Sequence, residues 1–472
     1  MSKEKVELKN LISNATKRNW DRLKFSGSDK LNSRANKKLS QKNIIPIEYF
    51  IDTNNVKFIE TLTNYIKQLN KDIFDVLYSL SVNLLTNKNI INKQNVKKTL
   101  LEYDTHALIP ELLNIELPNN EKDILGIIYQ ALLSEGEKNI FGSYYTINSV
   151  TINMTKDLNF SNNETFFDPC CGSGAFLLSL NNLHPKQIFG ADINPIAVLL
   201  AKVNLLLKYP NYDFIPQIYC YDYLNKKNMK NKYDYIITNP PWGASNVKSI
   251  SNTITSKESF SLFFEKAYYQ LKDKGIIRFL FPESILNVKV HKDIRDFILK
   301  NGNLKQIYFY TNTFNGVTTK FVDILHEKND NLPSIDIIRD NLKTTILKKT
   351  FFENTNHIFN ILDNEDISII KKVKKLGKYN LSNSTWALGV VTGDNKTKLS
   401  NSLKDGFEKI YTGKEITPFK LKPAQNYIKY DRKQLQQVAK DEIYRAKEKL
   451  VYKFISNKLV FAYDNSSSLF LN

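Results

Sequence analysis

The sequence predicts an α/β protein built on a doubly wound, mostly parallel sheet of seven strands. Two observations support this fold. Short apolar runs alternate with helical patterns from residue 164 to about 330, and the segments that could hold a ligand come directly after strands. Sheets of this kind bind ligands beyond the carboxyl ends of their strands. The expected strands are 165–167, 187–193, 214–221, 233–238, 276–281, 304–310 and 321–326, and the expected helices are 175–180, 196–207, 260–271 and 293–299.

The region before this sheet predicts a helical N-terminal domain. Apolar residues recur every three or four positions between 55 and 135, as in a helix with one buried face; the first such stripe is Val56, Ile59, Leu62, Ile66 and Leu69. We therefore expect three domains: a helical domain at 1–135, the α/β domain at 136–330 and a mixed α+β domain at 331–472. Residues 330–380 are expected to form connecting helices and loops.

Composition narrows the possible partners. The net charge is +19, of which residues 1–50 carry +7 and residues 371–472 carry +12, so the 320 residues between them are neutral. Positive charge at both ends indicates a polyanion such as nucleic acid. No apolar run approaches the roughly 18 residues of a membrane span. The start is unlike a signal peptide, and three cysteines without metal-ligand spacing indicate a cytoplasmic protein without a metal site or disulfide framework.

The segment Thr238–Gly243 reads Thr-Asn-Pro-Pro-Trp-Gly and follows the strand at 233–238. Two prolines end that strand, because neither has an N–H to donate to a sheet. Pro240 also disfavours the helical conformation at Asn239. The sequence thus predicts a stiff turn that leaves the Asn239 amide and the Pro240 carbonyl free to accept hydrogen bonds, with Trp242 beside them.

Two acceptors beside an aromatic face suit an exocyclic amine on a flat ring. The lone pair of such an amine is conjugated into the ring, and two acceptors on its hydrogens would stabilise the positive charge that develops when it attacks an electrophile. A stacked aromatic side chain would hold the plane of the base, an interaction worth about 1–3 kcal/mol. The alternative is a Pro-Pro turn whose Trp242 fills a gap in the core.

A second motif follows the strand at 165–167. Gly172 and Gly174 permit a tight turn and a close approach of the backbone to a ligand, although the third glycine of the dinucleotide fingerprint is absent. Asp168 precedes this loop, and Asp192 and Asp222 end the next two strands. Asp192 is placed to accept hydrogen bonds from ribose hydroxyls, and Asp222 from an adenine amino group. Each aspartate alone could be a turn former or helix cap.

Together these motifs resemble the gamma group of adenine-N6 DNA methyltransferases of restriction–modification systems. The order matches: an aromatic loop at Gly142–Thr146, then Asp168–Phe176, then Asn239–Trp242, then a recognition region. The resemblance covers nearly the whole chain. Segments 34–40, 389–395 and 444–450 resemble restriction–modification methylases and their TaqI-like C-terminal specificity domain.

The resemblance implies a Rossmann-like methyltransferase fold, S-adenosyl-L-methionine as the cofactor and double-stranded DNA as the substrate. A cognate restriction endonuclease or a separate specificity chain is a further implied partner. The implied catalytic residues are Asn239, Pro240, Pro241 and Trp242. The implied cofactor-binding residues are Tyr144, Tyr145, Thr146, Asp168, Cys171, Gly172, Gly174, Asp192, Ile193, Asp222 and Tyr223.

Two departures from the family leave alternatives open. Ile147 stands where the family has proline. The chain stops at 469–472 in an apolar, strand-like piece, so an incomplete recognition domain is expected. The alternatives are a DNA-binding remnant without activity, a methyltransferase acting on RNA or protein glutamine, and a bifunctional restriction enzyme. For the last, residues 1–130 contain no Pro-Asp…Asp/Glu-x-Lys nuclease pattern.

Overall fold

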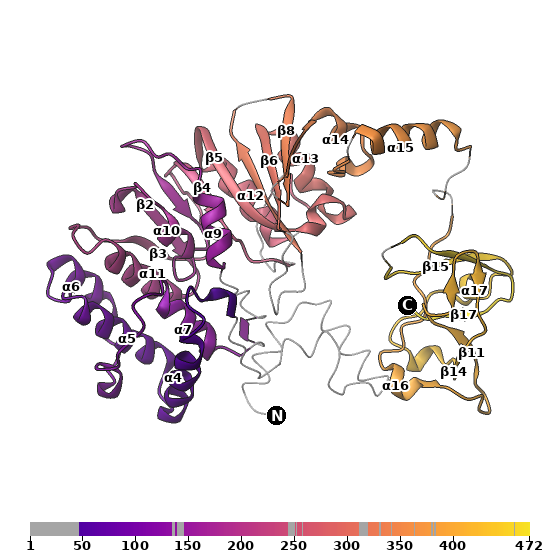
Figure 1. Ribbon diagram of the computed structural model, residues 1–472, viewed down its shortest axis with the longest axis horizontal. Helices are drawn as coiled ribbons and strands as arrows, with labels where there is room; N and C mark the ends of the chain where they lie inside the picture. The colour runs from indigo at the N-terminus through magenta and orange to yellow at the C-terminus, as the bar shows by residue number, and fades with distance from the viewer. Residues whose placement is uncertain are drawn as a thin grey trace. The chain divides into compact units, whose positions relative to one another are not determined.

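The computed structural model describes residues 47–134, 137–138, 146–243, 251, 253–256, 258–310, 320–329, 332–340, 342–362, 364–378, 381, 384–456 and 458–472. These residues form two compact units, one within 47–362 and one within 364–472 (Figure 1). Among the described residues, no helix is both long and apolar enough to cross a membrane.

The larger unit is organised around a nine-stranded sheet with the order β3-β2-β1-β4-β5-β7-β6-β8-β9. Its first five strands pair in parallel, whereas β7 is antiparallel to both of its neighbours. The bounds are β1 Phe166–Asp168, β2 Ile188–Asp192, β3 Gln217–Cys220, β4 Tyr233–Thr238, β5 Leu271–Pro282, β6 Asn303–Phe309, β7 Phe321–Glu327, β8 Ser334–Arg339 and β9 Leu342–Leu347. The α/β fold and all seven expected strands are confirmed.

Alternating residues of the central strands enter two separate hydrophobic cores, one on each face of the sheet. Phe166 and Ile237 belong to the core shared with helices α10 (Ala175–Ser179) and α11 (Pro195–Lys208), and Phe167 and Ile236 belong to the core shared with α12 (Ser259–Tyr269) and α13 (Lys292–Lys300). All four side chains are fully buried. This double burial explains why the strands read as continuous apolar runs.

The helical segment that precedes the sheet packs on the first of these cores. It consists of α4 (Asn55–Leu69), α5 (Ile73–Asn87), α6 (Gln94–Leu100) and α7 (Ile124–Leu132), followed by α9 (Asn148–Thr155). Ile59, Leu62 and Ile66 form the buried face of α4, as their spacing predicts. Helices α5 and α7 contact α11, so this helical segment and the sheet form one continuous core (Figure 1).

The expectation of only helices and loops after residue 330 is wrong for residues 334–347. There β8 pairs in parallel with β6, and β9 pairs antiparallel with β8, which extends the sheet to nine strands. Only Ile335 and Ile337 of this pair are buried, and β9 is exposed at five of its six residues. The expected helix appears later, as α14 (Lys349–Glu353) and α15 (Asn364–Leu376).

The smaller unit is a mixed α+β structure with a four-stranded sheet of order β10-β14-β11-β17. Its core contains Val390, Ile410, Ile428, Tyr444 and Leu469. Its elements are α16 (Asn395–Lys398), β10 (Leu399–Ser400), β11 (Glu408–Tyr411), β12 (Ile416–Thr417), β13 (Lys420–Leu421), β14 (Asn426–Ile428), α17 (Asp441–Tyr444), β15 (Lys449–Tyr452), β16 (Phe461–Asp464) and β17 (Leu469–Phe470). The strand-like piece expected at 469–472 corresponds to β17.

Candidate functional site

Four adjacent strands end at one edge of the sheet and carry the predicted site residues there. Strands β3, β2, β1 and β4 are neighbours and run in parallel, so their carboxyl ends share an edge. Asp168 ends β1, Asp192 ends β2, Asp222 follows β3 and Asn239 follows β4. This is the edge at which a doubly wound sheet binds ligands.

The glycine loop between β1 and α10 is held against the end of β2. Gly172 and Gly174 have φ angles of 54° and 99°, which favour glycine because a Cβ is strained there. The Gly172 N–H donates to Asp192 Oδ2 at 2.9 Å, and the Asn194 N–H donates to Asp192 Oδ1 at 2.9 Å. The Ile193 N–H also hydrogen-bonds this carboxylate. Since a carboxylate offers about four acceptor positions, one remains for a further donor. Beside it, the apolar side chain of Ile193 is 66% exposed.

Asp168 is buried and joins the ends of β1 and β4. Its Oδ1 accepts the Thr238 hydroxyl at 2.5 Å and the Cys170 N–H at 3.2 Å. The Cys170 thiol lies 2.9 Å from Thr238 Oγ1 and 3.5 Å from the Asn239 carbonyl oxygen. Asp168 therefore fixes the glycine loop relative to the Asn-Pro-Pro turn. Sequence analysis gave Thr238 no role, because its partners lie about 70 residues earlier in the chain.

Burial raises the pKa of the Asp168 carboxyl to about 7, against the lowering effect of its two donors. The folded chain therefore keeps a proton on Asp168 that the unfolded chain loses above pH 4. Between about pH 4 and pH 7, the folded state therefore binds more protons than the unfolded state. In this range the free energy of unfolding should fall as the pH rises.

An Asp168→Asn variant tests this pH dependence, because both donors reach Oδ1 and an amide keeps that acceptor. Its free energy of unfolding, relative to wild type, should rise by roughly 1 kcal/mol per pH unit from pH 5 to 7, measured by urea unfolding. Asp234→Asn is the control: a side-chain contact with Lys272 at 2.7 Å lowers the pKa of Asp234, so its effect on the free energy of unfolding should stay constant from pH 5 to 7. A constant difference between Asp168→Asn and wild type would contradict the prediction.

The Asn-Pro-Pro-Trp turn leaves two acceptors without a partner among the described residues. Asn239 Nδ2 donates to the Thr146 hydroxyl oxygen at 3.2 Å, so Oδ1 is the free end of the amide. The Pro240 carbonyl oxygen likewise accepts no hydrogen bond from a described group. Thr146 comes from the predicted aromatic loop, which the structure thus brings to the turn from 93 residues away.

Trp242 and its two neighbours in the chain are anchored by hydrogen bonds and ring packing. The indole N–H lies 3.4 Å from the Leu280 carbonyl oxygen, and the ring packs against Phe321 with centroids 6.3 Å apart. The Ser259 hydroxyl, at the start of α12, donates toward the carbonyl oxygens of Pro241 and Gly243 at 2.5 and 2.9 Å. The indole is half-buried, so it combines packing in the core with a remaining exposed part.

Two of the predicted cofactor residues are engaged elsewhere. The Asp222 carboxylate accepts from the backbone and side-chain amides of Asn225, at 3.2 and 2.6 Å, as in an ordinary turn. The side chain of Tyr223 is fully buried, and its hydroxyl donates to Gln270 Oε1 at 2.5 Å. Cys171 is buried behind the glycine loop. Tyr144 and Tyr145 lie outside the described residues.

Sequence analysis also missed Asp123. It precedes α7, and its carboxylate accepts hydrogen bonds from Gly126, Ser173 and Asn204, which lie on three different segments. The sequence offers no signal for this cluster, because the partners are as far as 81 residues apart.

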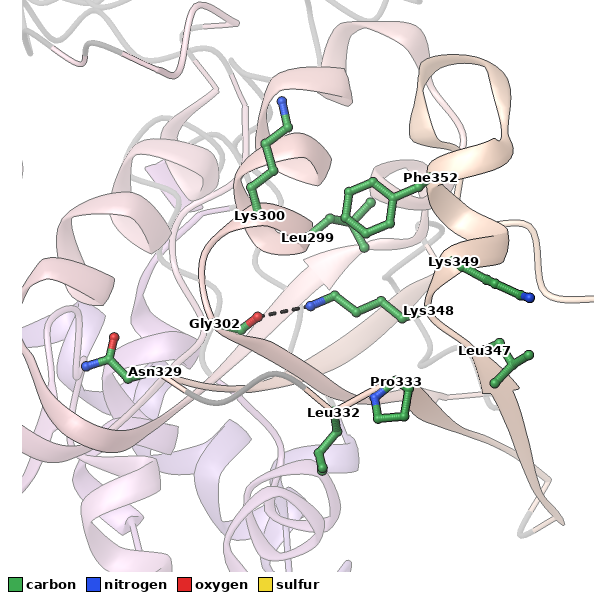
Figure 2. A pocket seen from close by; sticks show the side chains of 10 residues that line it. All are labelled: Leu299, Lys300, Gly302, Asn329, Leu332, Pro333, Leu347, Lys348, Lys349 and Phe352. Atoms are coloured by element: carbon green, nitrogen blue, oxygen red, sulfur yellow. Dashed lines mark hydrogen bonds between the residues drawn. The ribbon is translucent and has the colours of Figure 1, made fainter.

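A large open cavity of about 900 Å³ lies elsewhere in this unit (Figure 2). Gly302 and Pro333 line it directly before β6 and β8, which run parallel to the strands of the site, so the cavity is at the opposite edge of the sheet. In Figure 2 the side chains of Lys300, Asn329 and Lys349 point in different directions and do not converge on one point. This cavity is therefore separate from the candidate site. The described residues contain no cluster of three or more His, Cys, Asp or Glu that could hold a metal ion.

Comparison with known proteins identifies the family to which the chain belongs. The family model for N-6 DNA methylase matches residues 120–385, and the model for the TaqI-like C-terminal specificity domain matches residues 408–472. The type II methyltransferase M.VspI from Vibrio sp. (strain 343) is 28% identical over 347 residues, covering 69% of this chain and 83% of that protein. The type I restriction enzyme MjaIX methylase subunit from Methanocaldococcus jannaschii is 30% identical over 179 residues, covering 34% of this chain and 31% of that subunit.

A solved structure with the same fold is the cryo-electron microscopy structure of a DrdV–DNA complex. It has a TM-score of 0.56 at 12% sequence identity and covers 98% of this chain and 61% of that one. The family and the fold imply S-adenosylmethionine as the cofactor. The resemblance drawn from the motifs is confirmed: the chain belongs to the N-6 DNA methylase family, and it is a DNA adenine methyltransferase of restriction–modification type with a TaqI-like specificity domain.

Proposed function

We propose that this chain methylates N6 of a specific adenine in double-stranded DNA, with Asn239, Pro240, Pro241 and Trp242 as its catalytic turn. The observation that carries the proposal is the state of Asn239. Its amide nitrogen is committed to Thr146, and its Oδ1 and the neighbouring Pro240 carbonyl accept no hydrogen bond from described residues. Two fixed acceptors at the binding edge of the sheet are what an exocyclic amine requires.

The turn would act by polarising the amine. Asn239 Oδ1 and the Pro240 carbonyl oxygen each accept a hydrogen bond from one N–H of the amine. These hydrogen bonds localise the lone pair on the nitrogen and stabilise the positive charge that develops there. The methylated nitrogen sheds its extra proton to solvent after transfer. Because N6 is paired within the duplex, the adenine must leave the stack, at a cost of about a few kcal/mol. The exposed part of Trp242 would stack on the extruded base and offset that cost.

The residues at the ends of β1 and β2 fit S-adenosylmethionine. Asp192 keeps an acceptor position for a ribose hydroxyl, and the exposed Ile193 offers an apolar surface for the adenine ring. Gly172 and Gly174 allow the backbone to approach the methionine part, in a pocket that Asp168 and Cys171 shape. When bound, the cofactor supplies an electrophilic methyl group.

The remaining cofactor contacts rest on the family resemblance. Tyr144, Tyr145 and Thr146 would contact the cofactor, and Asp222 would accept from its adenine amino group by exchanging its Asn225 contact. Tyr223 could contribute only through its backbone, because its side chain is in the core.

The smaller unit would select the DNA site. Residues 371–472 carry a net charge of +12, which suits contacts with phosphates, while side chains that reach base edges would select the sequence. We further propose that a cognate restriction endonuclease or a specificity chain acts with this protein, and that it works in the cytoplasm.

Modification-sensitive sequencing of DNA from a host that expresses the chain tests the proposal. We expect N6-methyladenine in one defined sequence context, and unmodified DNA from a host that expresses the Asn239→Ala variant. Methylation of a different base, or modification only in RNA or protein, would overturn the proposed substrate.

A further inference from the structure

Asp123 joins three segments that are far apart in the sequence. Its Oδ1 accepts the Gly126 N–H at 2.9 Å and Asn204 Nδ2 at 2.7 Å, and its Oδ2 accepts the Ser173 hydroxyl. Gly126 belongs to helix α7 of the helical segment, Asn204 to α11, and Ser173 to the glycine loop. One partly buried carboxylate therefore holds the helical segment, helix α11 between β2 and β3, and the cofactor loop together.

Ser173 is the middle residue of Gly172-Ser173-Gly174, and it is held on two sides. Its side chain is buried and bonded to Asp123, and its carbonyl oxygen accepts Asn204 Nδ2 at 2.9 Å. The flanking glycines have little conformational preference of their own, so the loop loses much entropy when it is ordered. Fixing the residue between them preorganises the loop, which reduces the ordering cost of binding.

Helix α7 approaches this contact so closely that only glycine fits at position 126. A Cβ on Gly126 would lie 2.2 Å from Asp123 Oδ2 and 2.4 Å from Ser173 Oγ. Any side chain at this position would push the Asp123 carboxylate away from Ser173. The close packing of helix α7 on the glycine loop therefore depends on the hydrogen bond between Asp123 and Ser173.

We propose that Asp123 is a positioning residue for the cofactor loop, through which the helical segment sets the affinity of the enzyme for S-adenosylmethionine. Asp123 itself would not touch the cofactor; it acts through Ser173 on the backbone of the loop. This inference rests on the proposed use of Gly172 and Gly174 for cofactor binding.

Two substitutions at position 123 separate the hydrogen bonds from the charge. Asp123→Ala removes all three contacts and should weaken S-adenosylmethionine binding about tenfold or more, measured by calorimetry on the full chain. Asp123→Asn should bind within about threefold of wild type, because Oδ1 still accepts Gly126 and Asn204 and the amide can donate to Ser173 Oγ. Gly126→Ala should weaken binding as Asp123→Ala does, although alanine is the better helix former.

A matched control tests whether the effect is specific to the loop. Asp75 lies in the same helical segment and accepts hydrogen bonds from His106 Nδ1 and the Ala107 N–H, both at 3.1 Å, without contact to the loop. Asp75→Ala should lower the melting temperature but leave the cofactor dissociation constant unchanged. In methylation assays, Asp123→Ala should raise the KM for the cofactor with little change in kcat.

The outcomes distinguish this inference from the proposed S-adenosylmethionine site on which it rests. If Asp123→Ala binds as wild type does, or if Asp75→Ala weakens binding equally, Asp123 is only a structural residue and the inference is overturned. If the unsubstituted chain fails to bind S-adenosylmethionine, the proposed cofactor site is overturned and the inference falls with it.

Discussion

Replacing Asn239 with alanine should reduce methyl transfer about a hundredfold to a thousandfold or more, the range seen when one preorganised charge-stabilising group is removed. The substitution deletes Oδ1, one of two acceptors for the target amine, and also the contact with Thr146. The Pro240 carbonyl alone would leave one N–H of the amine unpaired in the transition state. The measurement is incorporation of a tritiated methyl group into DNA in a single turnover.

The control variants show whether the loss of activity lies in methyl transfer or in cofactor binding. Asn239→Asp keeps an acceptor at Oδ1 and should retain more activity than Asn239→Ala. Both variants should bind S-adenosylmethionine within about threefold of wild type, because the amide is proposed to hold the target base. If the alanine variant transferred methyl groups at the wild-type rate, the Asn-Pro-Pro-Trp turn would not be the catalytic turn.

Replacing Asp323 with alanine should destabilise the larger unit by about 3–5 kcal/mol. Asp323 on β7 pairs with Arg278 on β5 through two hydrogen bonds of 2.7 and 3.1 Å, and their side chains are 0% and 5% exposed. It also accepts the Tyr310 hydroxyl at 2.8 Å. Removing the aspartate leaves the guanidinium buried, with the carbonyl oxygens of Asn153 and Met154 as its only remaining partners in the described part of the chain.

A double substitution and a surface pair test this explanation by urea unfolding. Arg278→Met combined with Asp323→Leu should recover most of the loss, because a well-packed apolar pair can replace a buried ion pair. The exposed pair Lys343–Asp336 should contribute less than about 1 kcal/mol. A double variant as unstable as Asp323→Ala would show that the charge left behind is not the cause.

The same network extends toward the Asn-Pro-Pro-Trp turn. The Tyr310 hydroxyl also accepts Asn153 Nδ2 at 3.0 Å, and its ring packs on Phe321 with centroids 5.0 Å apart. Phe321 in turn contacts Trp242. Part of the activity lost on substitution of Asp323 would therefore come from a less ordered Trp242.

The sequence predicted the strands of the sheet well because local signals mark them. Strand β4 has the bounds expected from its apolar run and the Pro-Pro pair, and α11 begins at Pro195, directly after an Asn194 cap. Strands β8 and β9 were missed because they lie toward the sheet's exposed edge. Their residues are half polar, and pairing with β6 stabilises them more than their own composition does.

The sequence predicted those residues of the candidate site that can be identified from their type and their position after a strand. Asn239, Asp192 and Gly172 were identified by their places after strands. Asp123 and Thr238 were not, because their roles depend on contacts about 50 to 81 residues away in the chain. Tyr223 shows what position alone does not reveal: it follows β3, and its ring fills the core beside Phe167 and Phe263, so only its backbone is left for the predicted ligand contact.

The three cysteines differ in a way that makes the enzyme easy to label. Burial raises the thiol pKa values of Cys170 and Cys171 well above the ordinary range, so both stay protonated and poorly nucleophilic. Cys220 is exposed at the end of β3, two residues before Asp222. A fluorophore attached to Cys220 by maleimide chemistry would therefore report from beside the proposed cofactor site without any engineered thiol.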